Sequence, residues 1–264
     1  ITGESAPIAR LHPSIKGVWG GQTAGGSIVS FNLDSFKSYG HEQGDNAPVS
    51  ETAAQKYTTV LNRFLDRDSG HRIQIGDAST VFWADASGAK AQESEDLFVQ
   101  MMGDAPAKPD EEVQSKRIGE LLERLRRGEQ LETLRPDLVE GVRFHVLGLA
   151  PNAARISIRF NYDDDFRELV KNYQRFVSDM QIEPPWREPH PPLWRYLVET
   201  AVLGKRENVP RNLSGEWMRS ILAGTRYPMT LLATTLSRIR ADGEINALRA
   251  SILRALLIRN FNKD

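Results

Sequence analysis

The residues with the clearest chemical potential lie in a glycine-rich loop at 15–32, which ends in a run of β-branched and aromatic residues. Glycine adopts positive φ angles freely and lets a ligand approach the main chain, which suits a phosphate or a nucleic-acid backbone. The five glycines that fall within ten positions are Gly17, Gly20, Gly21, Gly25 and Gly26. The polar side chains that accompany them are Lys16, Gln22, Thr23, Ser27 and Asn32. The pattern indicates either a binding loop or a flexible hairpin with glycines at its turns.

The same loop lacks the residues of a nucleotide-binding P-loop. Gly20 and Gly25 match the glycine spacing of the G-x-x-x-x-G-K-[ST] motif, but Gly26 occupies the position of its phosphate-bridging lysine. The residues after Ser27 are mostly β-branched or aromatic and favour a strand, so no helix N-terminus would face a phosphate there. The sequence therefore argues against an NTPase site.

A second candidate for phosphate binding is the predicted strand at 154–160. Apolar residues alternate in it with polar ones, so that one face is apolar and the other carries Arg155 and Arg159. Arginines four residues apart on a strand lie about 13 Å apart, far enough to meet two phosphates of one backbone. Asn152 lies in the turn expected before this strand. The alternative, in which the arginines pair with acidic residues such as Asp163–Asp165, remains open.

Catalytic and metal-binding motifs are missing from the sequence. The five histidines lack the H-x-x-x-H and H-E-x-x-H spacings of metal sites, and no G-x-S-x-G nucleophile motif occurs. Asp163–Asp165 could hold magnesium in an enzyme that binds a phosphorylated substrate on the glycine-rich loop. Consecutive residues on a turn point in different directions, however, and such a run typically caps the following helix. We therefore predict a binding protein without catalytic residues, metal or cofactor, and keep the magnesium-dependent enzyme as the alternative.

The composition fits a folded protein that meets nucleic acid with one surface. The 264 residues are 40% hydrophobic, enough for a core, and include no cysteine, which excludes disulfides and fits a cytoplasmic location. No apolar run approaches the roughly 18 residues of a membrane span, so we expect no membrane partner. Residues 187–264 hold 13 Lys and Arg against 7 Asp and Glu, whereas residues 1–186 hold 21 against 28. A basic C-terminal third suits contact with nucleic acid, although scattered arginines on a solvated helix give the same count.

The elements that must position these residues follow from periodicity and capping. Ser50 is the expected N-cap of an amphipathic helix that extends to Leu65. Alternating apolar residues and turn residues predict the strands of a small sheet at 27–31, 72–77, 79–84, 142–149 and 154–160. Amphipathic helices are expected at 113–127 and 165–180.

Two further segments lack the pattern of a regular core element. The region 85–112 is acidic and poor in large apolar residues, so we predict a surface insertion with a short helix at 96–102. The proline-rich segment 182–192 is the expected boundary between an α+β domain at 1–183 and a helical region at 184–264.

The helical region consists of four expected helices, at 193–203, 213–223, 229–239 and 245–261. In the last of them Arg249, Arg254 and Arg259 recur every five residues, which drifts around a helix and forms no single phosphate-binding face. Together the elements predict an α+β fold, with a small mixed or antiparallel sheet and packed helices followed by a mostly helical C-terminal region.

The order of four sequence blocks resembles the large subunit of the subtype I-C CRISPR surveillance complex (Cascade). These blocks lie at 8–17, 30–49, 147–160 and 215–228, and together they span nearly the whole chain. The resemblance also implies a longer protein, with a region before Ile1 and more helices after Asp264. We therefore expect the chain to be a fragment of such a subunit.

The resemblance implies a noncatalytic subunit of an RNA-guided antiviral complex in the cytoplasm. Such a subunit helps to recognise the flanking motif (PAM), binds target double-stranded DNA, contacts the guide RNA and the backbone subunits, and recruits a nuclease-helicase. In complexes of this kind base pairing reads most of the target, while protein reads the short flanking duplex. The residues then expected to approach DNA are Lys16, Gln22, Thr23, Ser27 and Asn32. Those expected to contact the nucleic-acid backbone are Asn152, Arg155 and Arg159.

Overall fold

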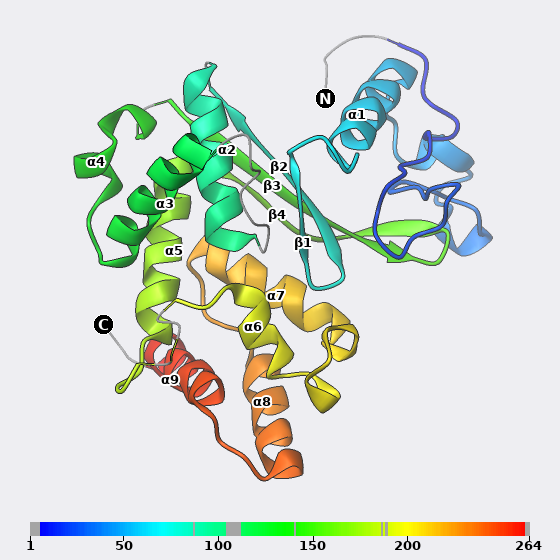
Figure 1. Ribbon diagram of the computed structural model, residues 1–264. Coiled ribbons are helices and arrows are strands. Elements are labelled where there is room, and N and C mark those ends of the chain that lie inside the picture. Colours follow the sequence, from blue (N-terminus) through cyan, green and yellow to red (C-terminus); the bar gives the residue numbers. More distant parts are fainter. Residues whose placement is uncertain are drawn as a thin grey trace.

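The computed structural model describes residues 6–261, apart from 87, 104–111, 140, 186 and 188–189. Its strands form one antiparallel sheet in the order β1-β2-β3-β4. Some helices pack on this sheet, and others lie beyond its edge (Figure 1). The strands are β1 (Arg72–Ile75), β2 (Ala78–Asp85), β3 (Arg143–Asn152) and β4 (Arg155–Asp165). The helices of the first part are α1 (Glu51–Phe64), α2 (Ala89–Met102), α3 (Glu112–Arg126), α4 (Leu131–Leu134) and α5 (Phe166–Met180). The expected α+β class is confirmed.

The C-terminal part is helical, as expected. Its α-helices are α6 (Leu193–Val198), α7 (Arg211–Ala223), α8 (Met229–Asp242) and α9 (Ala247–Phe261). The short 3-10 helices of the described residues are η1 (Asp34–Phe36), η2 (Gln43–Asn46), η4 (Pro136–Leu138), η5 (Val202–Gly204) and η6 (Arg206–Asn208). The expected helix at 193–203 is too long, because α6 ends at Val198 and Leu203 has a left-handed backbone with φ 59°.

Two apolar clusters lie on opposite faces of the sheet. The larger one joins the sheet to α2, α3, α5 and the C-terminal helices, whereas the smaller one joins it to α1 and the N-terminal segment. Phe82 belongs to the larger cluster and its neighbour Val81 to the smaller one, as expected because successive side chains of a strand point to opposite faces. Both faces of β2 are therefore buried.

A β-bulge at Arg159 changes which face of β4 is apolar. Gly148 of β3 pairs with Phe160 and Leu149 pairs with Ile158, which leaves Arg159 without an opposite residue. Because of this extra residue, Ile156 packs in the smaller cluster while Phe160 packs in the larger one. The prediction of one continuous apolar face is therefore wrong, and Ile158 is 49% exposed. The regular spacing assumed for Arg155 and Arg159 does not apply across the bulge.

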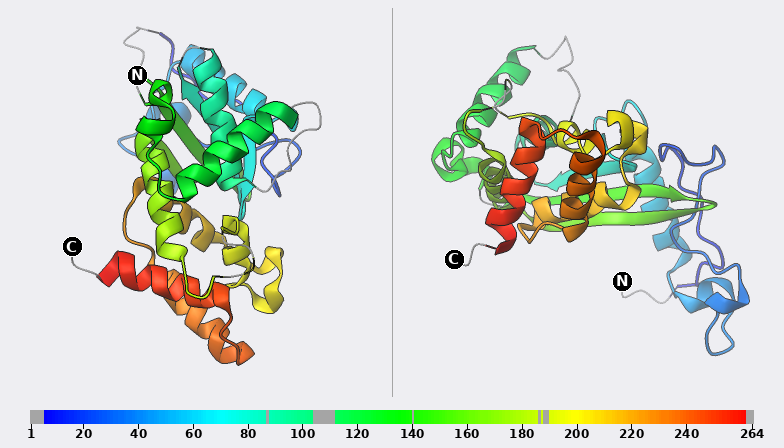
Figure 2. Two further views of the ribbon diagram at one scale, coloured as in Figure 1. Left: turned by 60° about the vertical axis from the view of Figure 1, so that its left-hand side comes forward. Right: turned by 90° about the horizontal axis from the view of Figure 1, so that it is seen from below.

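The β3–β4 hairpin reverses direction later than expected. Asn152 pairs with Arg155 as the last pair of the ladder, so the turn consists of residues 153 and 154 and not of Asn152. Ala153 adopts the left-handed region with φ 54°. Figure 2 shows this hairpin reaching from the helices to the N-terminal segment, which is drawn in dark blue.

The helix α1 begins where the sequence predicts. The side chain of Ser50 accepts a hydrogen bond of 3.2 Å from the backbone N–H of Ala53, so Ser50 is its N-cap. The strand expected at 27–31 is absent, because Ser27 makes one isolated parallel bridge with Arg155 and residues 28–31 join no ladder.

The expected surface insertion at 85–112 is wrong for residues 89–102. There the chain forms α2, whose Leu97, Phe98 and Met101 are buried against the sheet. These residues have helical spacing, which outweighs the acidic average composition of the region. The carboxylate of Glu95 accepts a hydrogen bond of 2.9 Å from the N–H of Ala84, and burial raises the pKa of Glu95. Residues 104–111 of the expected insertion lie outside the described residues.

One apolar cluster continues across the proline-rich segment 182–192. The rings of Phe176 in α5, Tyr196 in α6 and Trp217 in α7 lie within 6.2–6.4 Å of one another, centroid to centroid. The helix α7 also packs directly on β4, since a Cβ at Gly215 would lie 3.0 Å from the Cβ of Arg159. The two predicted regions thus share a core, and a domain boundary between them remains a prediction.

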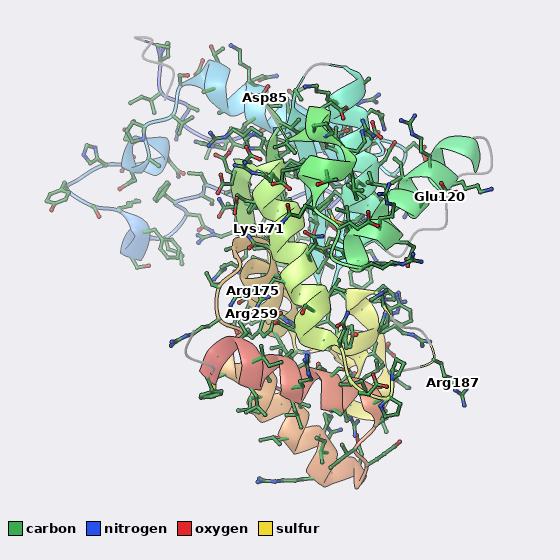
Figure 3. All side chains as sticks on the ribbon, turned by 90° about the vertical axis from the view of Figure 1, so that its left-hand side faces the viewer. Asp85, Glu120, Lys171, Arg175, Arg187 and Arg259 are labelled. Atoms are coloured by element: carbon green, nitrogen blue, oxygen red, sulfur yellow. The ribbon has the colours of Figure 1, made fainter. Side chains whose placement is uncertain are left out.

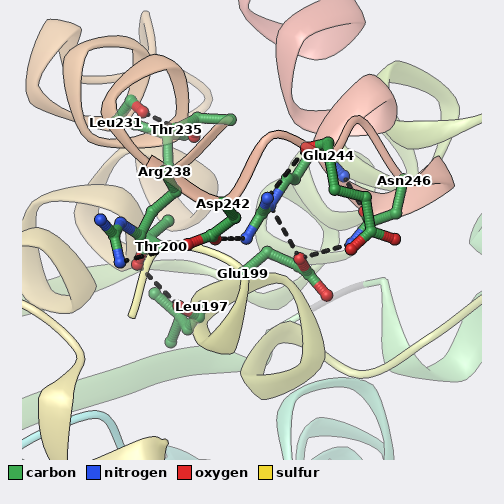
Figure 4. A network of polar contacts seen from close by, with 10 residues as sticks. Leu197, Glu199, Thr200, Leu231, Thr235, Arg238, Asp242, Glu244 and Asn246 are labelled. Carbon is green, nitrogen blue, oxygen red and sulfur yellow. Dashed lines mark hydrogen bonds and ion pairs between the residues drawn. The ribbon is translucent and has the colours of Figure 1, made fainter. Parts of the chain in front are cut away.

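The three arginines of α9 hold the C-terminal helices together. Arg259, labelled in Figure 3, is 1% exposed and forms a 2.6 Å ion pair with Asp179 of α5, which is 5% exposed. The guanidinium of Arg254 donates to the main-chain oxygens of Ser178 and Asp179. Arg249 pairs with carboxylates of two other elements, at 3.0 Å from Glu199 and 2.5 Å from Asp242, and Figure 4 shows the network around them.

Candidate nucleic-acid interface

The glycine-rich loop is closed at its base by backbone pairing. The N–H of Ile15 donates to the carbonyl of Gly26 at 2.8 Å, and the N–H of Gly26 donates back at 2.9 Å. Glycine is required at position 25, because its φ is +86° and a Cβ there would lie 2.6 Å from the carbonyl oxygen of Ile15. The buried side chain of Ile15 anchors this base in the smaller apolar cluster.

Main-chain hydrogen bonds fix the loop to three neighbouring elements. The N–H of Ile156 in β4 donates to the carbonyl of Ser27 at 3.0 Å. The N–H of Trp19 donates to Oγ of Ser79 in β2 at 2.9 Å, and the N–H of Lys16 donates to Oδ1 of Asn62 in α1 at 2.7 Å. The loop is therefore held against the tip of the β3–β4 hairpin (Figure 1).

Three of the residues predicted to approach DNA point away from this framework. Lys16, Gln22 and Thr23 are exposed, and their side chains make no hydrogen bond or ion pair with any residue that the structure describes. Glutamine offers both donors and an acceptor, and lysine offers a point charge, so the group can contact a base edge and a phosphate. All three residues lie on the glycine-rich loop.

The other two residues of that prediction have local contacts. Ser27 is half-buried at the base of the loop, and its carbonyl is used by β4. Asn32 is exposed, and its Oδ1 accepts a hydrogen bond from the guanidinium of Arg155. The same guanidinium stacks on the ring of Phe36, 4.3 Å from its centroid. Arg155 therefore fastens the segment 32–36 to the hairpin.

Arg159 faces a different partner from Arg155. Its Nη2 lies 2.7 Å from Oδ2 of Asp77 in the β1–β2 turn, and its Nη1 donates to Oδ1 of Asn212 at 3.0 Å. The side chains of Arg159 and Asp77 are only 21% and 17% exposed. This is the acidic pairing that the sequence left open, although the partner is Asp77. Asn152, the third backbone candidate, is exposed at the hairpin tip.

The three consecutive aspartates serve as local hydrogen-bond acceptors. Asp163 pairs with Arg143 at 2.5 Å, and this hydrogen bond lowers the pKa of Asp163. Asp165 accepts from the N–H of Arg167 at 2.8 Å and caps α5, as the sequence indicated. Within the described ranges, no group of three His, Asp or Glu side chains is arranged to hold a metal ion.

Two residues at the loop were not predicted from the sequence. Trp19 is 58% exposed, and with Gln22 and Arg211 it lines a cavity of about 400 Å³ beside the hairpin tip. Arg211 is the first residue of α7, and across the described part of the chain its side chain has no carboxylate partner. The tryptophan next to Gly20 could have been noticed, since loops carry many binding residues. Arg211 carries no such signal, because only the fold brings it near residue 22.

The family of the chain follows from its sequence as a whole. The family model described as CRISPR-associated protein (Cas_Csd1) matches residues 1–264. The chain belongs to this family. This membership confirms that the chain is CRISPR-associated, as the resemblance implied. A comparison with curated proteins found no significant match.

Membership of a CRISPR-associated family is compatible with the geometry of the loop. The family is CRISPR-associated by its description, and the loop offers exposed polar side chains on a main chain bonded to neighbouring elements. None of the helices among the described residues combines the length and apolarity needed to cross a bilayer.

Proposed function

We propose that the chain is part of the noncatalytic large subunit of a subtype I-C surveillance complex, and that its glycine-rich loop contacts the duplex flanking the target. The observation that carries this proposal is the group Lys16, Gln22 and Thr23, exposed and unpaired on a loop whose main chain is bonded to α1, β2 and β4. A preorganised loop loses little conformational entropy when it binds. Such a loop can therefore discriminate between base pairs with few contacts.

Gln22 and Lys16 of the group have separate roles in this proposal. Gln22 reads a base edge, because its amide can donate and accept at once. Lys16, together with Arg211 beside Gln22, contacts phosphates and sets the register of the duplex. Asn152 and Arg155, at the hairpin tip beside the loop, extend the contact with the backbone. Arg159 joins them only if phosphate replaces Asp77 as its partner.

The same proposal assigns the remaining surfaces to the complex. The subunit works in the cytoplasm, contacts the guide RNA and the backbone subunits, and presents a surface to the recruited nuclease-helicase. No described residue is assigned to catalysis, because the aspartates nearest to a magnesium site are used as a cap and as an ion-pair partner.

The proposal is tested by duplex binding to the assembled complex over a series of flanking motifs and salt concentrations. The complex with Gln22→Ala/Thr23→Ala should lose its preference among motifs, while the fold is unaffected because both side chains are exposed and unpaired. The matched control is Thr52→Ala/Gln55→Ala, which removes the same two residue types from the exposed face of α1. An unchanged motif preference in the loop variant would contradict the proposal.

A further inference from the structure

A mostly apolar cavity close to the loop lies between β1, α6, η6 and the start of α7. Its volume is about 850 Å³, within the range of small-ligand sites. It shares Trp19, Asp77 and Arg211 with the smaller cavity beside Gln22. The two cavities are therefore adjacent, and a ligand held at the glycine-rich loop can reach both.

The walls of this cavity combine aromatic and apolar surfaces. Trp194 of α6 lines it with the guanidinium of Arg206 stacked on the indole, 3.7 Å from the ring centroid. Trp19 contributes a second indole from the loop side. The apolar part of the wall includes Ile73, Ile75, Met102, Leu197 and Val209. The guanidinium of Arg195 also lies over the Trp194 ring, at 5.0 Å, so the flat surfaces offered to a ligand are the stack of Trp194 with arginine and the indole of Trp19.

Two polar atoms of the wall are buried without a hydrogen bond. Oδ1 of Asp77 is an acceptor and Nε1 of Trp194 is a donor, and neither has a partner among the residues that the structure describes. The second carboxylate oxygen of Asp77 is already paired with Arg159. Both atoms are covered by neighbouring side chains, so a ligand reaches them only where those side chains move aside. A buried polar atom without a partner is unfavourable, and a ligand that then supplies a donor and an acceptor is favoured over a purely apolar one.

We propose that this cavity receives one unstacked nucleobase of the DNA that the glycine-rich loop contacts. A nucleobase has the required features: two apolar faces, and an edge with donors and acceptors. Its phosphates would lie near the guanidinium of Arg211 at the rim. This inference rests on the proposed function for the delivery of the DNA, and it adds a base-specific pocket to the contact with the duplex.

The test is a thermodynamic cycle between Trp194 and individual bases. Affinity of the assembled complex is measured for duplexes in which each nucleotide near the flanking motif is in turn replaced by an abasic site. At one position, the ratio of intact to abasic affinity should be about 5- to 150-fold larger for wild type than for Trp194→Ala, the equivalent of one stacked base. The cost of unstacking the base cancels where the base is unstacked in both complexes. Where the Trp194→Ala complex leaves the base in the duplex, the change in the ratio is smaller by that cost.

Two further variants separate stacking from damage to the fold. Trp194→Phe keeps an aromatic face and should keep most of the position-specific ratio. Leu203→Ala changes a neighbouring apolar residue that is 78% exposed and does not line the cavity, and it should leave all ratios unchanged. If Trp194→Ala weakens intact and abasic duplexes equally at every position, the cavity does not hold a base and the inference is wrong.

The inference and the proposed function fail in different ways. An unchanged motif preference in the Gln22→Ala/Thr23→Ala complex contradicts the loop contact, whatever the abasic series gives. A missing position-specific effect of Trp194→Ala, with motif preference lost in the loop variant, contradicts only the base pocket.

Discussion

The arginines of α9 and the polar side chains of the glycine-rich loop differ in what they contact. Arg249, Arg254 and Arg259 all bond to carboxylates or carbonyls of other helices, and they stabilise the packing of α9. Lys16 and Gln22 are exposed at the other end of the molecule, and their side chains have no partner among the described residues. These three arginines of the basic C-terminal third are therefore used in packing between helices.

The difference shows that the hydrogen-bond and ion-pair partners of a charged side chain must be known before the side chain is given a role in binding. An arginine that is buried with a carboxylate cannot also bind phosphate without leaving that carboxylate unpaired. An exposed cation without a partner keeps its charge available for phosphate at little cost. By this criterion Arg211 belongs with the loop, although it comes from the basic third of the sequence.

The largest expected effect is on stability, from Arg259→Ala. The change leaves the buried carboxylate of Asp179 without its cation, and such a loss typically costs about 3–5 kcal/mol of unfolding free energy. Chemical denaturation of the chain measures it. Arg226→Ala removes an exposed arginine just after α7 and should change stability by less than about 0.5 kcal/mol. If the two changes lower the unfolding free energy equally, the buried Arg259 contributes no more to stability than the exposed Arg226, which contradicts the prediction.

An intermediate effect is expected from Arg159→Gln. Asp77 loses the charged partner of a largely buried pair, which should lower the unfolding free energy by about 1–3 kcal/mol. The same variant is measured for duplex binding across a salt series. An unchanged salt slope places Arg159 with the structural arginines, whereas a decrease of about 0.9 places it among the phosphate contacts.

Arg211→Gln should have the opposite pattern. Stability should stay within about 0.5 kcal/mol of wild type, because the side chain is exposed and has no carboxylate partner in the described part of the chain. The slope of log affinity against log salt should fall in magnitude by about 0.9, the value for one phosphate contact. Arg226→Gln serves as the exposed control and should keep the wild-type slope. A loss of stability without a change of slope would contradict the assignment of Arg211.

The smallest effect is expected from Arg143→Gln at the exposed pair with Asp163. The Arg143 guanidinium lowers the pKa of Asp163, so the pair stabilises the fold above the ordinary carboxyl pKa, and this contribution is lost as pH falls through the lowered value. In the variant the pKa of Asp163 should rise toward its ordinary value, as measured by NMR titration of the carboxyl carbon. An unchanged pKa would mean that Arg143 does not set it.

Much of the local structure could be predicted from the sequence. The N-cap Ser50, the cap Asp165 and the helices after residue 211 all depend on neighbouring residues, which the sequence displays directly. The glycine-rich loop was also visible, since a glycine is needed wherever φ is positive and the backbone passes close to another chain segment, as at Gly25.

The features that were missed depend on distant residues. The bulge at Arg159 arises where Gly148 of the next strand gives room to the ring of Phe160, which no pattern within β4 reveals. The partner of Arg159 is Asp77, 82 positions away, and the position of Arg211 beside Gln22 depends on the packing of α7 on β4. Candidate residues could therefore be found from the sequence. Which of them are paired within the fold and which are exposed without a partner could not.

The bulge in β4 has a mechanical consequence for the whole molecule. Because it reverses the buried face, the two ends of the β3–β4 hairpin are embedded in separate apolar clusters. The hairpin is thus packed in two separate apolar clusters along its length. Its strand β3, with 10 residues, spans about 33 Å at the usual rise per residue. The distance between the glycine-rich loop and the helices packed around α5 is accordingly set by the length of these strands. The loop and the helices are connected by paired strands and not by a flexible linker.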